Sequence, residues 1–102
     1  MTVEEIDKNI NDTISTGDVI LYFYLPDEIK CKKFLIDLES ISNEIHNKKF
    51  YKVSINSIEE FIEKFGIKFV PYVLFFKDGK QIGNISGIFE KDETIQKINQ
   101  LY

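Results

Sequence analysis

The sequence predicts an α/β domain in which helices cover a small mixed β-sheet, with elements in the order α-β-α-β-α-β-β-α. Segments rich in apolar β-forming residues alternate with segments of helical periodicity, which is typical of strands joined in parallel. The last two candidate strands flank Asp78-Gly79, a strong hairpin signal, so this pair must be antiparallel. A chain of 102 residues suits one domain, and we expect residues 1–102 to form it.

The first half of the chain predicts two helices around one strand. A possible capping box between Thr2 and Glu5 and the spacing of the following isoleucines predict a first helix over residues 2–14. Residues 19–24 are a continuous apolar run, typical of a strand buried on both faces, and Pro26 ends it. A second helix is expected over residues 29–46. Its apolar stripe consists of Cys31, Phe34, Leu35, Leu38, Ile41 and Ile45.

The second half predicts three strands and two helices. Alternating apolar residues indicate a strand over residues 50–55. The capping-box spacing of Ser57 and Glu60 begins a short helix that Gly66 ends. The hairpin strands are expected over residues 72–76 and 81–86, and a last helix over residues 92–101, with Ile95, Ile98 and Leu101 facing inward.

Charge and composition exclude several classes of protein. The net charge of -4 argues against general binding of nucleic acid. No segment approaches the roughly 18 apolar residues needed to span a membrane, and the polar start does not resemble a signal peptide. A single cysteine rules out an internal disulfide and suits a reducing compartment, so we expect a cytoplasmic protein. We also expect a monomer.

The single cysteine, Cys31, is the residue most indicative of function. It lies at the start of a helix that follows a buried strand, which is the geometry of a thiol-redox site. That chemistry ordinarily uses two sulfurs spaced Cys-x-x-Cys. Here Glu28 stands three residues before Cys31, so one thiol of the pair is missing.

Four motifs, in order and at matching distances, resemble the thioredoxin family across nearly the whole chain. FYLPDEIKCK resembles the family's FWAxWCGPCK, and Val70-Pro71 after Phe65-Gly66-Ile67 resembles YGI-x-x-[IV]-P. VLFFKDGKQIGNISG resembles the family hairpin, with Gly87 on its conserved glycine. Lys52 falls where the family has a lysine. The resemblance implies a thioredoxin fold with a cis peptide bond before Pro71.

The same register reveals departures from the family's chemistry. Glu28 falls on the first cysteine, the family's exposed nucleophile, and Cys31 on the second, its buried resolving thiol. The family's buried carboxylate would fall at Tyr22. A carboxylate cannot attack a disulfide or form a mixed disulfide, so the usual dithiol exchange is not available.

Individual residues allow more than one interpretation. Cys31 is either a buried structural residue or a reactive single thiol that is activated by the helix N-terminus and neighbouring lysines. Glu28 is either a helix cap or a catalytic acid, and its position favours the cap. Lys52, without its family partner, is expected to be a solvated lysine. His46 and Cys31 do not make a metal site, and we expect neither a metal nor a cofactor.

Together these observations predict a thioredoxin-like binding module in cell redox homeostasis rather than a dithiol enzyme. A protein or extended peptide would bind a groove formed by Pro26, Ile29, Val70 and Pro71, because the backbone before that proline pairs with partners in the family. The alternative is a single-thiol protein that acts through Cys31 in thiol-disulfide exchange or as an S-thiolation sensor. No nucleic acid or membrane partner is expected.

Overall fold

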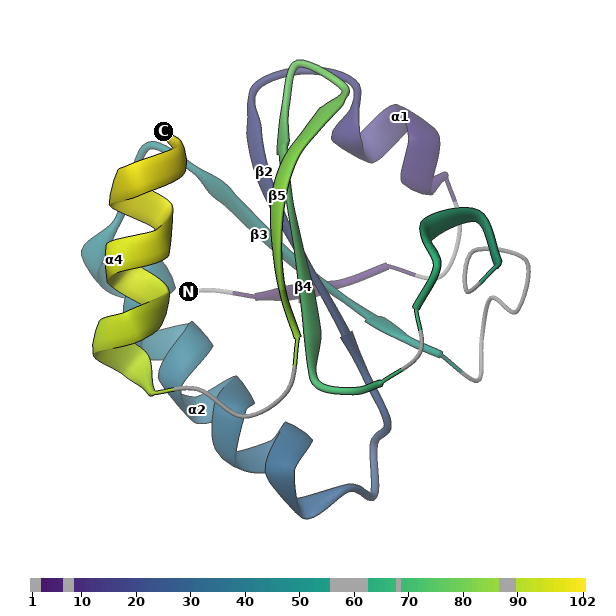
Figure 1. The fold of residues 1–102 in the computed structure, drawn as a ribbon, viewed down its shortest axis with the longest axis vertical. Coiled ribbons are helices and arrows are strands. Elements are labelled where there is room, and N and C mark those ends of the chain that lie inside the picture. Colours follow the sequence, from purple (N-terminus) through teal and green to yellow (C-terminus); the bar gives the residue numbers. More distant parts are fainter. Residues whose placement is uncertain (1–2, 7–8, 56–62, 68, 87–89) are drawn as a thin grey trace.

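A five-stranded mixed sheet forms the centre of the computed structural model, which describes residues 3–6, 9–55, 63–67, 69–86 and 90–102 (Figure 1). The strand order is β1-β3-β2-β4-β5. Strands β1, β3 and β2 run parallel to one another. Strands β4 and β5 each run antiparallel to the strands beside them. The predicted mixed sheet is therefore confirmed. The strands are β1 (Glu4–Glu5), β2 (Asp18–Tyr24), β3 (Lys49–Ser54), β4 (Tyr72–Lys77) and β5 (Lys80–Ser86).

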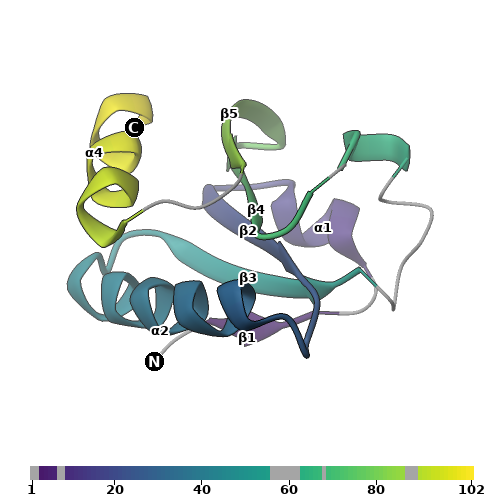
Figure 2. The same ribbon diagram turned by 60° about the horizontal axis from the view of Figure 1, so that its bottom comes forward.

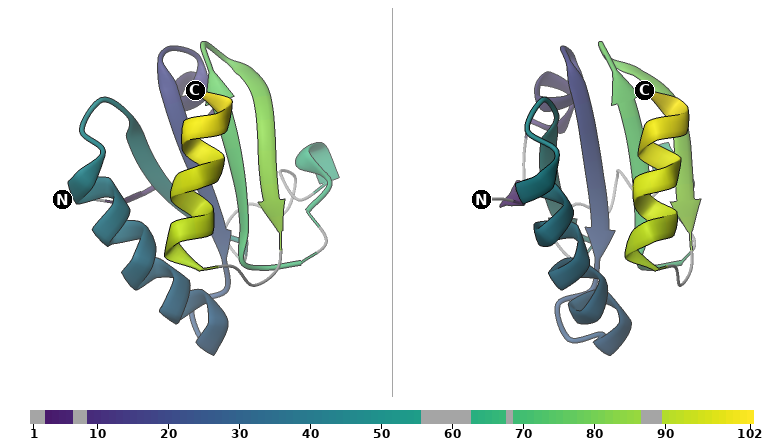
Figure 3. Two further views of the ribbon diagram at one scale, coloured as in Figure 1. Left: turned by 60° about the vertical axis from the view of Figure 1, so that its left-hand side comes forward. Right: turned by 90° about the vertical axis from the view of Figure 1, so that its left-hand side faces the viewer.

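Helices cover both faces of this sheet. On one face lie α2 (Ile29–Glu44) and α4 (Lys91–Leu101), and on the other lies α1 (Ile10–Ile14) (Figures 1 and 3). Lys91 joins the two long helices, since its Nζ is 3.1 Å from a carboxylate oxygen of Glu44 and donates to the Ser40 hydroxyl at 2.9 Å. Both long helices were predicted to within two residues at each end.

The core consists of two apolar clusters, one on each face of the sheet. Ile20 and Phe75 belong to the cluster beneath α2 and α4, whereas Leu21 and Leu74 belong to the cluster beneath α1. Successive strand residues alternate between the clusters because side chains alternate across a sheet. The buried run in β2 therefore fills both clusters, as its apolar sequence predicts.

The predicted helix over residues 2–14 is wrong in its first half. Glu4 and Glu5 form strand β1, paired with Tyr51 and Lys52, and Ile6 donates its backbone N–H to the Lys52 carbonyl at 2.9 Å. Parallel pairing with the exposed edge of β3 prevails over helical propensity here. The helix begins only after Asn9, which is in the left-handed region with φ 60. The capping box predicted between Thr2 and Glu5 includes Thr2, which lies outside the described residues.

The isoleucine pattern nevertheless identified the buried face of this segment. The isoleucines of the predicted helix all pack into the same core cluster, which is the one beneath α1. They are Ile6, Ile10 and Ile14. The helical spacing therefore predicted which side chains are buried, but it predicted the wrong backbone conformation at Glu4 and Glu5.

The hairpin between β4 and β5 turns at Asp78-Gly79 as predicted, with φ 49 and 85 at the two residues. Asp78 also fastens this turn to the start of β2. Its carboxylate accepts from the Gly17 N–H at 2.8 Å, and its own N–H donates to the Gly17 carbonyl at 2.9 Å. The predicted helix of residues 57–65 lies mostly outside the described residues, as does Gly87. Residues 63–65 are helical, and Gly66 follows them with φ 66.

Candidate functional site

The two segments of the predicted groove leave the same end of the sheet. Strand β2 runs into the Pro26 loop and α2, and β4 begins just after Pro71. These strands are antiparallel neighbours, with Phe23 opposite Tyr72. The last residues of β2 and the first residues of β4 therefore lie side by side at one end of the sheet. This places the Pro26 loop and the Val70-Pro71 segment on the same side of the molecule (Figure 2).

Glu28 acts as the N-terminal cap of α2. Its backbone is extended, and its Oε1 accepts a hydrogen bond of 2.8 Å from the backbone N–H of Lys30. Its own N–H donates to the Leu25 carbonyl at 3.2 Å, which closes the turn through Pro26. The capping interpretation of Glu28 is confirmed, because its carboxylate satisfies an N–H that has no partner inside the helix.

Cys31 lies in the core beneath this cap. The residue is only 1% exposed and packs in the cluster that also contains Phe34 and Val73. The half-buried side chain of Val70 packs against the same cluster, from the other segment of the candidate site. A small reagent or a partner's disulfide cannot reach this sulfur in the folded chain without some opening of the structure.

Tyr22 takes an unexpected role at the position where the family has a carboxylate. Its hydroxyl donates to the Cys31 carbonyl at 2.8 Å, and its ring stacks on Tyr24 and meets Phe34 edge-on, with centroids 5.6 Å and 5.2 Å apart. Burial raises the pKa of Tyr22 far above its ordinary value, and the neighbouring Cys31 raises it further. Tyr22 therefore stays neutral and ties the first turn of α2 to the sheet, a contact that sequence analysis did not identify.

Lys52 is not the fully solvated lysine that was expected. It is half-buried between its register neighbours Glu5 and Tyr22, and its Nζ lies 5.8 Å from the centre of the Tyr24 ring. The Tyr24 hydroxyl donates to Glu5 at 2.6 Å. Burial, followed by this bond to a carboxylate, raises the pKa of Tyr24. The described neighbours of Lys52 are therefore the Tyr24 ring and, in the strand register, the exposed Glu5.

The Val70-Pro71 segment presents backbone and an aromatic ring at the surface. The peptide bond between them is cis, Pro71 is buried and Val70 is half-buried. Phe69 is 69% exposed. Within the part of the chain that the structure describes, no hydrogen bond is made to the backbone of Phe69 or Val70. The backbone of this segment could therefore pair with another chain.

Other kinds of site find little support among the described residues. These residues contain no group of three or more His, Cys, Asp or Glu side chains that could hold a metal ion. Over the same ranges, none of the helices has the length and apolar character that crossing a bilayer would require.

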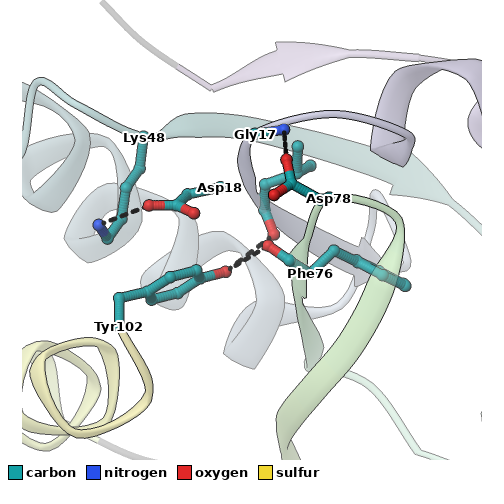
Figure 4. A network of polar contacts seen from close by, with 7 residues as sticks. Gly17, Asp18, Lys48, Phe76, Asp78 and Tyr102 are labelled. Atoms are coloured by element: carbon teal, nitrogen blue, oxygen red, sulfur yellow. Dashed lines mark hydrogen bonds and ion pairs between the residues drawn. The ribbon is translucent and has the colours of Figure 1, made fainter.

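The opposite end of the sheet holds a polar network that sequence analysis also missed (Figure 4). The Tyr102 hydroxyl donates to the carbonyls of Phe76 at 2.9 Å and Val19 at 3.2 Å. Lys48 lies 4.4 Å from the centre of the Tyr102 ring and 3.2 Å from Asp18. Nothing in the sequence around Tyr102 signals this role, because its hydrogen-bond partners lie 83 and 26 residues away.

The strand order, the strand directions and the cis bond before β4 are those expected of a thioredoxin fold. The Thioredoxin family model matches residues 1–100, and the chain belongs to this family. It is 33% identical to a thioredoxin of Chlamydia caviae over 93 residues, which cover 91% of each chain.

Two further comparisons extend this result. The chain is 31% identical to Phosducin-like protein 3 of Dictyostelium discoideum, covering 97% of this chain and 55% of that protein. The crystal structure of thioredoxin from Trypanosoma brucei brucei superposes with a TM-score of 0.90 at 20% identity, covering 97% of this chain and 89% of that one. The thioredoxin fold expected from the sequence is thus confirmed.

Proposed function

We propose that this protein is a thioredoxin-like binding module that does not carry out dithiol exchange. One observation carries the proposal: Cys31, the sole thiol, is 1% exposed, and Glu28 occupies the attacking position as a helix cap. Dithiol exchange requires an accessible thiolate and a second sulfur to release the product. A buried single thiol meets neither requirement.

The proposed binding surface lies between the Pro26–Cys31 loop and Val70-Pro71. Ile29 and Phe69, 66% and 69% exposed, supply apolar contacts on the two sides. The backbone N–H and C=O of Val70 would pair with an extended segment of a protein partner, as an added β-strand does. This interaction needs no sulfur, so it is compatible with the loss of the first cysteine.

Reduction of insulin by dithiothreitol tests the catalytic half of the proposal. We expect the protein to give no turnover above the uncatalysed rate. The matched variant combines Glu28→Cys, Ile29→Gly and Lys30→Pro, and it should form an internal disulfide and reduce insulin. Proline is tolerated in the first turn of a helix. It removes the Lys30 N–H, whose acceptor, the Glu28 carboxylate, is also absent from this variant. Turnover by the unmodified protein comparable to that of an ordinary thioredoxin would refute the proposal.

Reduced and alkylated insulin B chain, an extended and thiol-free probe, tests the binding half. We expect it to shift the amide resonances of Phe69 and Val70 in the isotope-labelled protein. Val70→Pro removes the N–H donor and should abolish the shift of the Phe69 amide. If the probe shifts neither residue, or if Val70→Pro binds as well as the unmodified protein, the binding surface is elsewhere.

A further inference from the structure

Tyr22 reaches from the sheet to the first turn of α2, at the point where that helix meets the core. The residue is fully buried, and its hydroxyl donates to the Cys31 carbonyl at 2.8 Å. Residues 26–30 precede this contact, and each of them is exposed or half-buried. The start of α2 also extends beyond the ends of the strands (Figure 3). Cys31 is therefore the first residue after β2 that the chain buries in the core.

The same tyrosine lies beside the second segment of the candidate surface. In the sheet, Tyr22 of β2 is directly opposite Val73 of β4. Strand β4 begins just after Val70-Pro71, and the side chain of Val70 packs against the cluster that contains Tyr22 and Cys31. Tyr22 thus holds the start of α2 through its hydroxyl and belongs to the strand pair that carries Val70. The relative position of the two sides of the surface depends on this one residue.

The Tyr22 hydroxyl makes a bond that the helix itself does not require. Within α2 the Cys31 carbonyl is the helical acceptor for the N–H of Leu35, four residues later, and a carbonyl oxygen can accept two hydrogen bonds. Loss of the hydroxyl therefore leaves this buried carbonyl with a partner. Burial raises the pKa of Tyr22, so its hydroxyl remains a donor. A phenylalanine would keep the ring contacts with Tyr24 and Phe34 and remove only this bond.

We propose that Tyr22 is a positioning residue of the binding surface. Its hydroxyl fixes the start of α2, and with it Ile29, relative to the Val70 segment. This inference rests on the proposed function, because it concerns the same surface. It adds a residue that cannot touch a partner itself, since Tyr22 is fully buried. A surface that is fixed before binding loses less conformational freedom when the partner arrives, so its affinity is higher.

Amide hydrogen exchange of the isotope-labelled full chain measures how often the start of α2 opens. The amides to follow are those of Glu28, which donates to the Leu25 carbonyl, and Lys32, which donates to the Glu28 carbonyl. We expect Tyr22→Phe to accelerate exchange at both amides by about 5-fold, the factor that one net hydrogen bond supplies. Exchange at Ile45, which donates to Ile41 at the far end of α2, should stay within about 2-fold.

The matched control is Tyr24→Phe, which makes the same chemical change on the same strand and the same face of the sheet. The Tyr24 hydroxyl donates to Glu5 and not to α2. Exchange at Glu28 and Lys32 should therefore stay within about 2-fold of the unmodified protein in this variant. A role of Tyr22 in overall stability alone would lower the urea midpoint of Tyr22→Phe without changing the local opening at these two amides.

The alkylated insulin B chain connects this opening with binding. If a partner binds the fixed form of the helix start, the bound probe must slow exchange at Glu28 and Lys32, because binding and opening are linked. At a free probe concentration of 10 times Kd we expect exchange about 10-fold slower. The same slowing should occur in Tyr22→Phe, measured at 10 times its own Kd.

Three results would overturn the inference. The first is unchanged exchange at Glu28 and Lys32 in Tyr22→Phe, and the second is equal acceleration in Tyr24→Phe. The third is a probe that shifts the Phe69 and Val70 resonances without slowing exchange at the helix start. A probe that shifts neither resonance in the unmodified protein would instead refute the proposed binding surface, and with it the assignment of Tyr22 to that surface. The inference and the proposed function therefore fail by different results.

Discussion

At the scale of single residues, Glu28 forms a helix cap at the position that the resemblance to thioredoxins assigns to the first cysteine. A cysteine at this position would expose a thiol at the helix start. The carboxylate instead accepts the Lys30 N–H at 2.8 Å and places negative charge at the helix N-terminus, where it is favoured. A side-chain cap typically contributes about 1 kcal/mol, so Glu28 helps to stabilise the start of α2.

Cys31 provides the sharpest test at this scale, because the single-thiol alternative requires it to react. We expect iodoacetamide to modify Cys31 in the folded protein about 100-fold more slowly than in urea. That factor corresponds to about 2.7 kcal/mol for the opening that exposes the buried sulfur. The rate is measured by mass spectrometry at neutral pH.

The matched control moves the thiol to the surface of the same helix. Cys31→Ser with Asn43→Cys places the only thiol at an exposed position of α2, and it should react as fast as a free thiol. If Cys31 itself reacts that fast without denaturant, the single-thiol function becomes the better account of this protein.

At the scale of elements, β5 and α4 depend on one close approach. An added Cβ at Gly83 would lie 2.5 Å from one methyl carbon of Leu101 and 2.9 Å from the other. A side chain at position 83 would therefore require the half-buried side chain of Leu101 to move. The Leu101 side chain in the last turn of α4 occupies the space left by the missing side chain on β5.

We expect Gly83→Ala to destabilise the protein by about 0.5–1.5 kcal/mol, the cost of moving the Leu101 side chain out of its preferred rotamer. Urea unfolding measures the change. The control is the same substitution in a Leu101→Ala background, where the clash is removed and the added cost should fall to near zero. An equal loss in both backgrounds would show that the strain arises elsewhere than at Leu101.

At the scale of the whole molecule, Tyr102 connects the C-terminal end of the chain to the central strands. Its hydroxyl bonds two carbonyls on the neighbouring strands β2 and β4, and its ring meets Phe75 edge-on with centroids 6.3 Å apart. Burial and the nearby Asp18 raise the pKa of Tyr102 well above its ordinary value. The hydroxyl therefore remains a donor throughout the neutral range.

Tyr102→Phe should lower the free energy of unfolding by about 1 kcal/mol, the net value of a typical hydrogen bond. Tyr102→Ala should cost about 3–5 kcal/mol, because the ring contacts are lost as well. The control is Tyr51→Phe, since the hydroxyl of this half-buried tyrosine makes no hydrogen bond with any described residue. Urea unfolding that finds both Tyr→Phe variants equally stable would contradict the assigned role of Tyr102.

Local sequence patterns determined most of the elements of this protein. The apolar run of β2, the stripe of α2 and the Asp78-Gly79 turn each contain enough periodicity or turn chemistry within a few residues to define their element. The position of Glu28 at the start of the second helix likewise predicted its role as a cap, because capping is a local interaction.

Tertiary structure decided what local patterns cannot encode. Residues 4 and 5 became a strand because β3 offered an unpaired edge, although their spacing fits a helix. Tyr22 became the partner of the Cys31 carbonyl, and Tyr102 the partner of two strands, only after distant segments had packed. Long-range contacts depend on the final geometry of the whole chain, and no short window of sequence contains that information.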